Sequence, residues 1–223
     1  MKKTSIFIGT LFLLLLSLSV IQASPKKKKK APTHRFGIYG SAIVAQGEFA
    51  STQGSKAGYA NNGIGLMAEY VQYTKFPVNW MSSVSLNAHS FKAGALQDQN
   101  PEYGITANSY YTLWFMTGIS QQKWFGPLLG VYGLAQIGFL YSHYPDIFYA
   151  KTEKDYVEYK ETTEAGKAFA YALGAGIRYN IINLGVRYYV AYPRYRQTSA
   201  FGQGTVTRNL PAKILQVVFG INF

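Results

Sequence analysis

The chain has 223 residues, of which 48% are hydrophobic, 16% aromatic and only 14% charged, so its surface carries far less charge than the roughly 25% of soluble domains. The formal net charge is +12, but the run Lys26 to Lys30 supplies five of the basic residues, and no nucleic-acid motif accompanies it, which argues against nucleic acid as a partner. Cysteine does not occur, which excludes disulfides, thiol chemistry and lipoprotein attachment.

Residues 1–23 are predicted to be a cleaved signal peptide. Lys2 and Lys3 precede an apolar stretch from about Ile6 to Val20, and Ile21-Gln22-Ala23 after it offers a small residue at a plausible cleavage point. The alternative is an uncleaved anchor at the short end of what can span a bilayer. Basic residues on the translocated side oppose the positive-inside tendency and favour cleavage. Residues 24–35 would then form a basic, disordered periplasmic leader, with contact to anionic lipid or peptidoglycan-associated acids as the alternative.

From Arg35 onward the dominant pattern is an alternation of period two. In 168–179 the odd positions are large and apolar and the even positions are small, and the same split recurs in 129–142 and 184–192. Strands of about 13 to 17 residues exceed the usual 5 or 6 of globular sheets, and a tilted membrane strand needs at least 9 to 11. We expect eight strands, at about 36–48, 59–74, 78–92, 105–121, 128–143, 167–180, 184–198 and 211–223.

The connections between these strands alternate strictly between short and long. The long ones are near 49–58, 93–104, 144–166 and 199–210, and the short ones near 75–77, 122–127 and 181–183. Transmembrane barrels alternate in this way between periplasmic turns and extracellular loops. The predicted fold class is therefore all-β, an eight-stranded antiparallel up-and-down transmembrane barrel over 36–223. A soluble barrel is the alternative, but its exterior would be rich in charge.

The carboxyl end carries the most specific signal. Leu215, Val217, Phe219, Ile221 and Phe223 alternate up to the last residue, which is aromatic. With the strand pattern, this ending resembles the small eight-stranded outer-membrane barrels, the OmpA-like, OmpX-like and Opa-like proteins. The resemblance implies the outer membrane of a Gram-negative-type bacterium, an assembly signal read by the barrel assembly machinery, and outer-membrane lipid and lipopolysaccharide as partners. A closed barrel has no edge strands, so we expect a monomer.

An eight-stranded barrel has a lumen that side chains nearly fill. Alternation places Glu69, Arg178 and Arg187 inside, near the end that carries the short turns, and predicts an ion pair of Glu69 with Arg187 or Arg178. We interpret this as a structural plug; gating of a small conductance is the alternative. The other inward positions are Tyr39, Ser41, Met67, Asn79, Ser83, Ser85, Asn87, His89, Asn108, Trp114, Met116, Gln136, Tyr189 and Gln216.

Aromatic residues near the strand ends predict girdles at the two membrane interfaces. Trp80, Trp124, Phe125 and Phe223 would mark the periplasmic rim. The outer rim would carry Tyr110, Tyr141, Tyr144, Tyr192 and Tyr195.

Enzymatic chemistry is the weaker prediction. His34 and His89 have no convergent partners in the pattern, whereas Ser142, His143 and Asp146 cluster near the outer leaflet, where lipid A deacylases and acyltransferases of similar barrels act. The deacylase pattern His-x-Ser-Asn does not occur, and a nucleophile needs a base and an orienting group in space. We expect no enzyme, no metal site and no cofactor.

The leading functional hypothesis is a structural or surface-interaction protein that acts through its extracellular loops. The likeliest contact surface is the charged loop 144–166. A small channel is the second hypothesis and a lipid A modifying enzyme the third. The candidate loop surface consists of Asp146, Glu153, Asp155, Glu158, Glu161 and Glu164.

Overall fold

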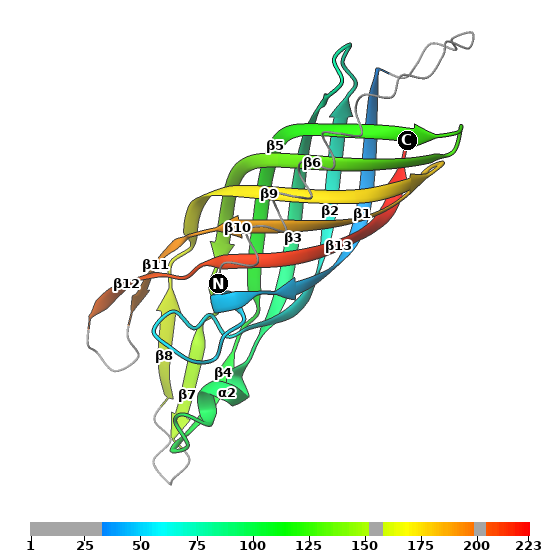
Figure 1. The fold of residues 1–223 in the computed structure, drawn as a ribbon. Helices are drawn as coiled ribbons and strands as arrows, with labels where there is room; N and C mark the ends of the chain where they lie inside the picture. Colours follow the sequence, from blue (N-terminus) through cyan, green and yellow to red (C-terminus); the bar gives the residue numbers. More distant parts are fainter. Residues whose placement is uncertain (1–32, 152–157, 199–203) are drawn as a thin grey trace, which may run out of the picture.

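The computed structural model describes residues 33–151, 158–198 and 204–223, so the predicted signal peptide and most of the predicted leader lie outside them. Eight long antiparallel strands close on themselves, because β10 pairs with both β9 and β13, and β13 pairs with β1. The predicted fold class is confirmed (Figure 1). The barrel strands are β1 (His34–Ala45), β2 (Ala60–Gln72), β3 (Asn79–Phe91), β5 (Tyr110–Phe125), β6 (Leu129–His143), β9 (Gly166–Tyr179), β10 (Ile182–Ala191) and β13 (Ala212–Asn222).

One end of the barrel, the turn end, carries three short connections, at 73–78, 126–128 and 180–181. Gly126 (φ 78°) and Asn180 (φ 53°) have the left-handed backbone that tight hairpin turns require. The closing seam also ends here, where Phe223 and Phe36 exchange two backbone hydrogen bonds of 2.9 Å. The turn expected at 122–127 is only 126–128, because β5 stays paired with β6 up to Phe125. The sequence predicts an earlier strand end because the polar residues Gln121 to Lys123 interrupt the apolar alternation.

The first strand begins at His34, two residues earlier than predicted. Arg35 is therefore not a leader residue. It pairs in register with Val71 of β2, and its side chain is buried inside the barrel. The predicted leader is therefore too long. In the sequence, Arg35 follows a lysine-rich segment and looks like another solvated charge, but in the structure it pairs with the carboxylate of Glu69 in the lumen.

The opposite end, the loop end, continues beyond the barrel as a second sheet. The connections expected to be plain loops contain α2 (Ala93–Gln97), β7 (Ile147–Lys151), β8 (Glu158–Thr163) and β12 (Thr205–Asn209). Two further elements cross an expected boundary between strand and loop: η2 (Gly47–Phe49) and β4 (Tyr103–Ala107). With β11 (Arg194–Thr198), these strands form the loop-end sheet, in the order β4-β7-β8-β11-β12. Figure 1 shows them at the end of the barrel away from the carboxyl terminus.

Two predicted strands are each divided in the structure. The strand expected at 105–121 is β4 followed by β5, and the strand expected at 184–198 is β10 followed by β11. Pro193 lies at the second break, where its missing N–H cannot join a ladder.

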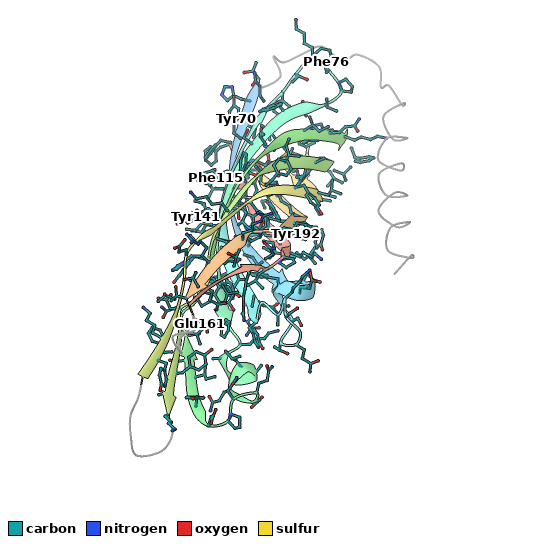
Figure 2. The ribbon with its side chains drawn as sticks, turned by 90° about the vertical axis from the view of Figure 1, so that its left-hand side faces the viewer. Tyr70, Phe76, Phe115, Tyr141, Glu161 and Tyr192 are labelled. Carbon is teal, nitrogen blue, oxygen red and sulfur yellow. The ribbon has the colours of Figure 1, made fainter. Side chains whose placement is uncertain are left out.

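The outer wall of the barrel is apolar. Exposed apolar side chains on four of the barrel strands include Leu66, Leu86, Phe139 and Phe169. Figure 2 shows Tyr70, Phe115 and Tyr141 along this wall, between Phe76 at the turn end and Glu161 beyond the wall at the loop end. No helix of the described residues is long and apolar enough to cross a membrane.

The exposure of the predicted girdle residues agrees with the prediction at the turn-end rim and contradicts it for part of the outer rim. Trp80, Trp124, Phe125 and Phe223 are exposed, and so are Tyr141 and Tyr192 at the other rim. Tyr110, Tyr144 and Tyr195 are at most 2% exposed and pack together, with ring centroids 5.0 Å apart for Tyr110 and Tyr144 and 5.6 Å apart for Tyr144 and Tyr195. Tyr110 and Tyr195 have the parity of the inward residues of β5 and β11, and Tyr144, one residue past β6, continues the parity of Ser142, which places all three in the core.

Side chains fill the lumen. The loop half holds one apolar, aromatic cluster around Phe49, Tyr110, Trp114 and Tyr189. The turn half holds two smaller clusters and nearly all the buried charge. The barrel thus encloses a core with an aromatic half and an ionic half.

Candidate functional site

The ionic half of the lumen centres on Glu69 of β2, which is 1% exposed. Its Oε1 accepts a hydrogen bond from Arg35 Nη2 at 2.8 Å and lies 3.6 Å from Arg178 Nη2. Its Oε2 accepts a hydrogen bond from Arg187 Nη2. The structure thus brings the three predicted residues together and adds Arg35, so one carboxylate joins β1, β2, β9 and β10 across the lumen.

Strand register explains why these side chains meet. Arg187 lies opposite Gly174 of β9 and Gln216 of β13, so its long side chain crosses the lumen over a residue without a side chain. A methyl group at Gly174 would lie 3.0 Å from Arg187 Cγ. The small inward face of β9 therefore makes room for the guanidinium group that reaches Glu69.

Aromatic and amide groups support the ionic cluster. The Arg178 guanidinium lies 4.3 Å from the centroid of the Tyr132 ring, a favourable cation–π contact. The Tyr132 hydroxyl donates to Asn183 Oδ1 at 2.9 Å, and Asn183 Nδ2 donates to the Tyr39 hydroxyl at 3.2 Å. Tyr39 in turn donates to Asn222 Oδ1 at 2.6 Å. This chain of hydrogen bonds connects β6, β10, β1 and β13, and so crosses the closing seam twice.

The arrangement closes the turn half of the lumen. Charges buried in a low-dielectric interior are tolerated only when they are paired and hydrogen-bonded, and removal of one partner is costly. The cluster therefore ties β1, β2, β9 and β10 together across the lumen, as expected of a structural plug, while the plug role itself stays a prediction.

The residues proposed for lipid A chemistry do not converge. Ser142 is fully buried and accepts a hydrogen bond from the Tyr195 hydroxyl at 2.7 Å. His143 follows it on the same strand, so its side chain points to the outer face and is exposed. Asp146 forms an ion pair of 3.0 Å with Lys160. These three residues do not form a nucleophile, base and orienting group.

The other two histidines lie far from that cluster. His34 is exposed at the turn end. His89 is buried in the loop half, where its ring packs edge-on against Phe49 at 5.4 Å and its Nδ1 lies 3.3 Å from the Asn61 carbonyl oxygen. Within the described ranges, no group of three or more His, Cys, Asp or Glu residues could hold a metal ion.

The acidic candidate surface is only partly free for contacts. Glu161 is partly buried and accepts a hydrogen bond from the Tyr149 hydroxyl at 3.1 Å, while burial raises the pKa of its carboxyl group. Asp146 pairs with Lys160 as described, and Glu164 is exposed. Glu158 begins β8, while Glu153 and Asp155 lie outside the described residues. The acidic contact surface stays a prediction.

A basic strip on the outer face of the loop end was not predicted. Lys167 of β9 and Arg194 of β11 are directly opposite in register, and Arg196 follows on the same outer face; all three are exposed. No acidic side chain of the described residues lies within ion-pair distance of them, although Glu164 is joined to Arg196 through the backbone. Lys167 Nζ lies 5.9 Å from the Tyr141 ring, at the outer aromatic rim. The alternation along β9 and β11 is the sequence signal that could have found this strip, because it places all three residues on the outer face.

The carboxyl-terminal residues lie as predicted. Val217, Phe219, Ile221 and Phe223 are exposed on the outer wall and Leu215 is partly exposed, while Gln216 and Asn222 are buried. Phe223 packs against Phe36 with ring centroids 5.4 Å apart. The geometry makes this segment the closing strand; its reading by the assembly machinery stays a prediction.

Comparisons with known proteins agree with this geometry at the level of the fold. No protein-family model and no curated protein matches the chain. Among solved structures, it is similar to a major outer membrane protein of Thermus thermophilus, with a TM-score of 0.51, 10% identity, and coverage of 85% of this chain and 99% of the other.

Two further structures match less well. OprG of Pseudomonas aeruginosa gives a TM-score of 0.49 at 10% identity, with 85% of this chain and 95% of that chain covered. Ail of Yersinia pestis, its attachment invasion locus protein, gives 0.44 at 10% identity, with 85% and 96% covered.

The closed barrel, its apolar outer wall and its filled lumen define the class: this is a transmembrane β-barrel of eight strands. More particularly, it has the fold of the small outer-membrane barrels, as the resemblance in the sequence implied.

Proposed function

We propose that this barrel lies in the outer membrane and has a non-catalytic surface-interaction role, carried by its loop-end sheet and the basic strip at the base of that sheet. The observation that carries the proposal is the pair Lys167 and Arg194. Like charges directly opposite on neighbouring strands destabilise a sheet unless an anion lies between them. Their position next to Tyr141 corresponds to the depth of lipid head groups if the loop end faces outward.

The phosphates of lipopolysaccharide are the anions that this position favours. Basic clusters at a membrane surface attract anionic head groups, by about 1 kcal/mol for each Lys or Arg near the surface. Two arginines and a lysine on one outer face form such a cluster. The barrel itself would serve as a rigid anchor, since its lumen is filled and its polar groups are tied across the seam.

The test compares vesicles of phosphatidylcholine with and without lipopolysaccharide. The double variant R194Q/R196Q should lose most of the thermal stabilisation that lipopolysaccharide gives the wild type. The matched control K75Q/K123Q removes two lysines at or near the turn end and should keep the full effect. Equal stabilisation in all three proteins would refute the basic strip as a binding surface.

The two alternatives have direct tests. Trp114, Tyr189 and Arg187 fill the lumen, so planar-bilayer recordings should be flat, and steady single-channel conductance would support the channel hypothesis instead. Lipid A mass spectra should be identical for cells that express the wild type or His143→Ala. A mass change that requires His143 would establish the enzyme.

A further inference from the structure

We propose that the turn half of the lumen contains a binding site for one small inorganic anion, between Arg35, Arg178 and Gln122. The site is separate from the surface-interaction role. It follows from a charge imbalance and from an excess of hydrogen-bond donors in the ionic cluster.

The charge imbalance is visible in the burial of the described residues. Their buried carboxylates and guanidinium groups are Glu69, Arg35, Arg178 and Arg187. Three positive charges and one negative charge leave two positive charges uncompensated. A buried charge without a partner is unfavourable, because the interior does not replace the solvation that water gives it.

The excess charge is concentrated between Arg35 and Arg178. Both guanidinium groups approach the same atom, Glu69 Oε1, at 2.8 Å and 3.6 Å, so the Nη2 atoms of the two arginines cannot be farther apart than these distances combined. Two like charges at such a separation repel strongly in a medium of low dielectric constant. The second oxygen of Glu69 is engaged by Arg187 and is not available to separate them.

The hydrogen-bond inventory at this point consists only of unused donors. Among the described residues, Arg35 Nε, Arg178 Nε, Arg178 Nη2 and Gln122 Nε2 are buried and lack a hydrogen-bond acceptor. Gln122 is held next to Arg178, because its Oε1 accepts from Arg178 Nη1. An anion offers acceptor capacity in several directions and also supplies the missing negative charge, whereas a water molecule supplies only the former.

A contrast deeper in the lumen shows what a water site looks like. Arg187 Nε and Nη1 also lack acceptors, but Gln216, its register partner on β13, has a buried Oε1 that lacks a donor. Donors and an acceptor thus occur on register partners of neighbouring strands, and one bridging water would satisfy both without any added charge. Around Arg35 and Arg178 the unused groups are all donors.

The packing limits the size of the anion. A methyl group at Gly37 would overlap the Tyr39 hydroxyl, and one at Gly176 would overlap that of Tyr132. This tight packing of aromatic side chains beside the cluster favours a small inorganic anion over an organic one. Gln122, which is partly exposed near the turn 126–128, and Arg35, with 8% of its surface exposed, lie closest to solvent and give a halide ion an entry path from the turn end.

Bromide provides a direct test, because it replaces chloride and scatters anomalously. Crystals of the full chain in sodium bromide should show an anomalous peak within hydrogen-bond distance of Arg35 and Arg178. Data from a crystal in which this position holds only water, with bromide confined to the surface, would overturn the proposal.

A solution test uses thermal unfolding in detergent micelles at constant sodium concentration. Replacement of the bulky anion gluconate by chloride should raise the unfolding midpoint of the wild type by about 2–4 °C, because chloride binds only the folded state. Arg178→Gln should abolish that rise. Lys123→Gln removes a charge from the same end but outside the lumen, and should keep it.

If Arg178→Gln does not fold, Arg35→Gln carries the test, since Arg178 and Arg187 then still face Glu69. A chloride effect of the same size in Arg35→Gln or Arg178→Gln as in the wild type would refute the site.

Discussion

Replacement of Glu69 by Gln should produce a large loss of stability, because it removes the only buried carboxylate among the described residues. The side chains of Glu69 and Arg187 are both 0% exposed, so solvent does not screen the charge that remains. Breaking a buried ion pair from one side costs about 3–5 kcal/mol. With three guanidinium groups left around one neutral amide, we expect a loss in the upper half of that range.

The measurement is urea unfolding of the barrel in lipid vesicles, followed by tryptophan fluorescence. Asp146→Asn is the control, because it breaks the partly exposed pair with Lys160, where about 0–1 kcal/mol is expected. The double variant E69Q/R187Q restores the charge balance of the wild type and should be less destabilised than Glu69→Gln alone, although it lacks more contacts. Additive losses, or a loss below about 1 kcal/mol for Glu69→Gln, would show that the cluster does not act as a charge-coupled unit.

Three further predictions concern other parts of the chain. Burial raises the pKa of Glu161 in the folded protein, so the folded state binds its proton more tightly than the unfolded chain does; proteolytic protection of the loop-end sheet should fall as the pH rises through this pKa, and Glu161→Gln should flatten that dependence. Gly185→Ala places a methyl group against the Tyr132 hydroxyl, closer than van der Waals contact, and should cost about 1–3 kcal/mol in urea unfolding, whereas Gly40→Ala meets nothing within 4 Å and should be nearly neutral; equal losses would contradict the packing. Deletion of Phe223 should reduce the fraction of barrel that migrates as the folded form on an unboiled SDS gel, and normal insertion would contradict its role in assembly.

The sequence predicts the barrel well because one physical constraint acts on every strand. Lipid outside and a packed lumen inside force alternation, and this parity alone places Glu69, Arg178 and Arg187 on the inner face. The same parity also predicts that Tyr110 points inward, because it shares the parity of Thr112 on β5. Residue type alone suggests a girdle position for Tyr110, and parity is the better guide.

The sequence does not predict the loop-end sheet, and the reason is physical. Its strands have five or six residues and lie outside the lipid, so no uniform environment imposes alternation on them. Their stability comes from contacts between distant segments, such as Tyr103 with Tyr149, whose rings lie 6.0 Å apart. Pairing between β4 and β7 depends on where the barrel strands end, which local pattern does not specify.

The placement of the ionic cluster links the closing strand to the charges inside. β13 lies between β1 and β10, so Arg35 and Arg187 come from the two strands that β13 joins, while Glu69 lies on β2 and Arg178 on β9. Arg35 and Glu69 lie on neighbouring strands, but Arg178 and Arg187 can reach Glu69 across the lumen only when the barrel is closed. A slip of one residue in the pairing of β10 would turn Arg187 toward lipid, where an exposed charge costs about 2–4 kcal/mol at the midplane. The charges are therefore paired only when the barrel closes in the correct register, and the cluster favours this register over registers shifted by one residue.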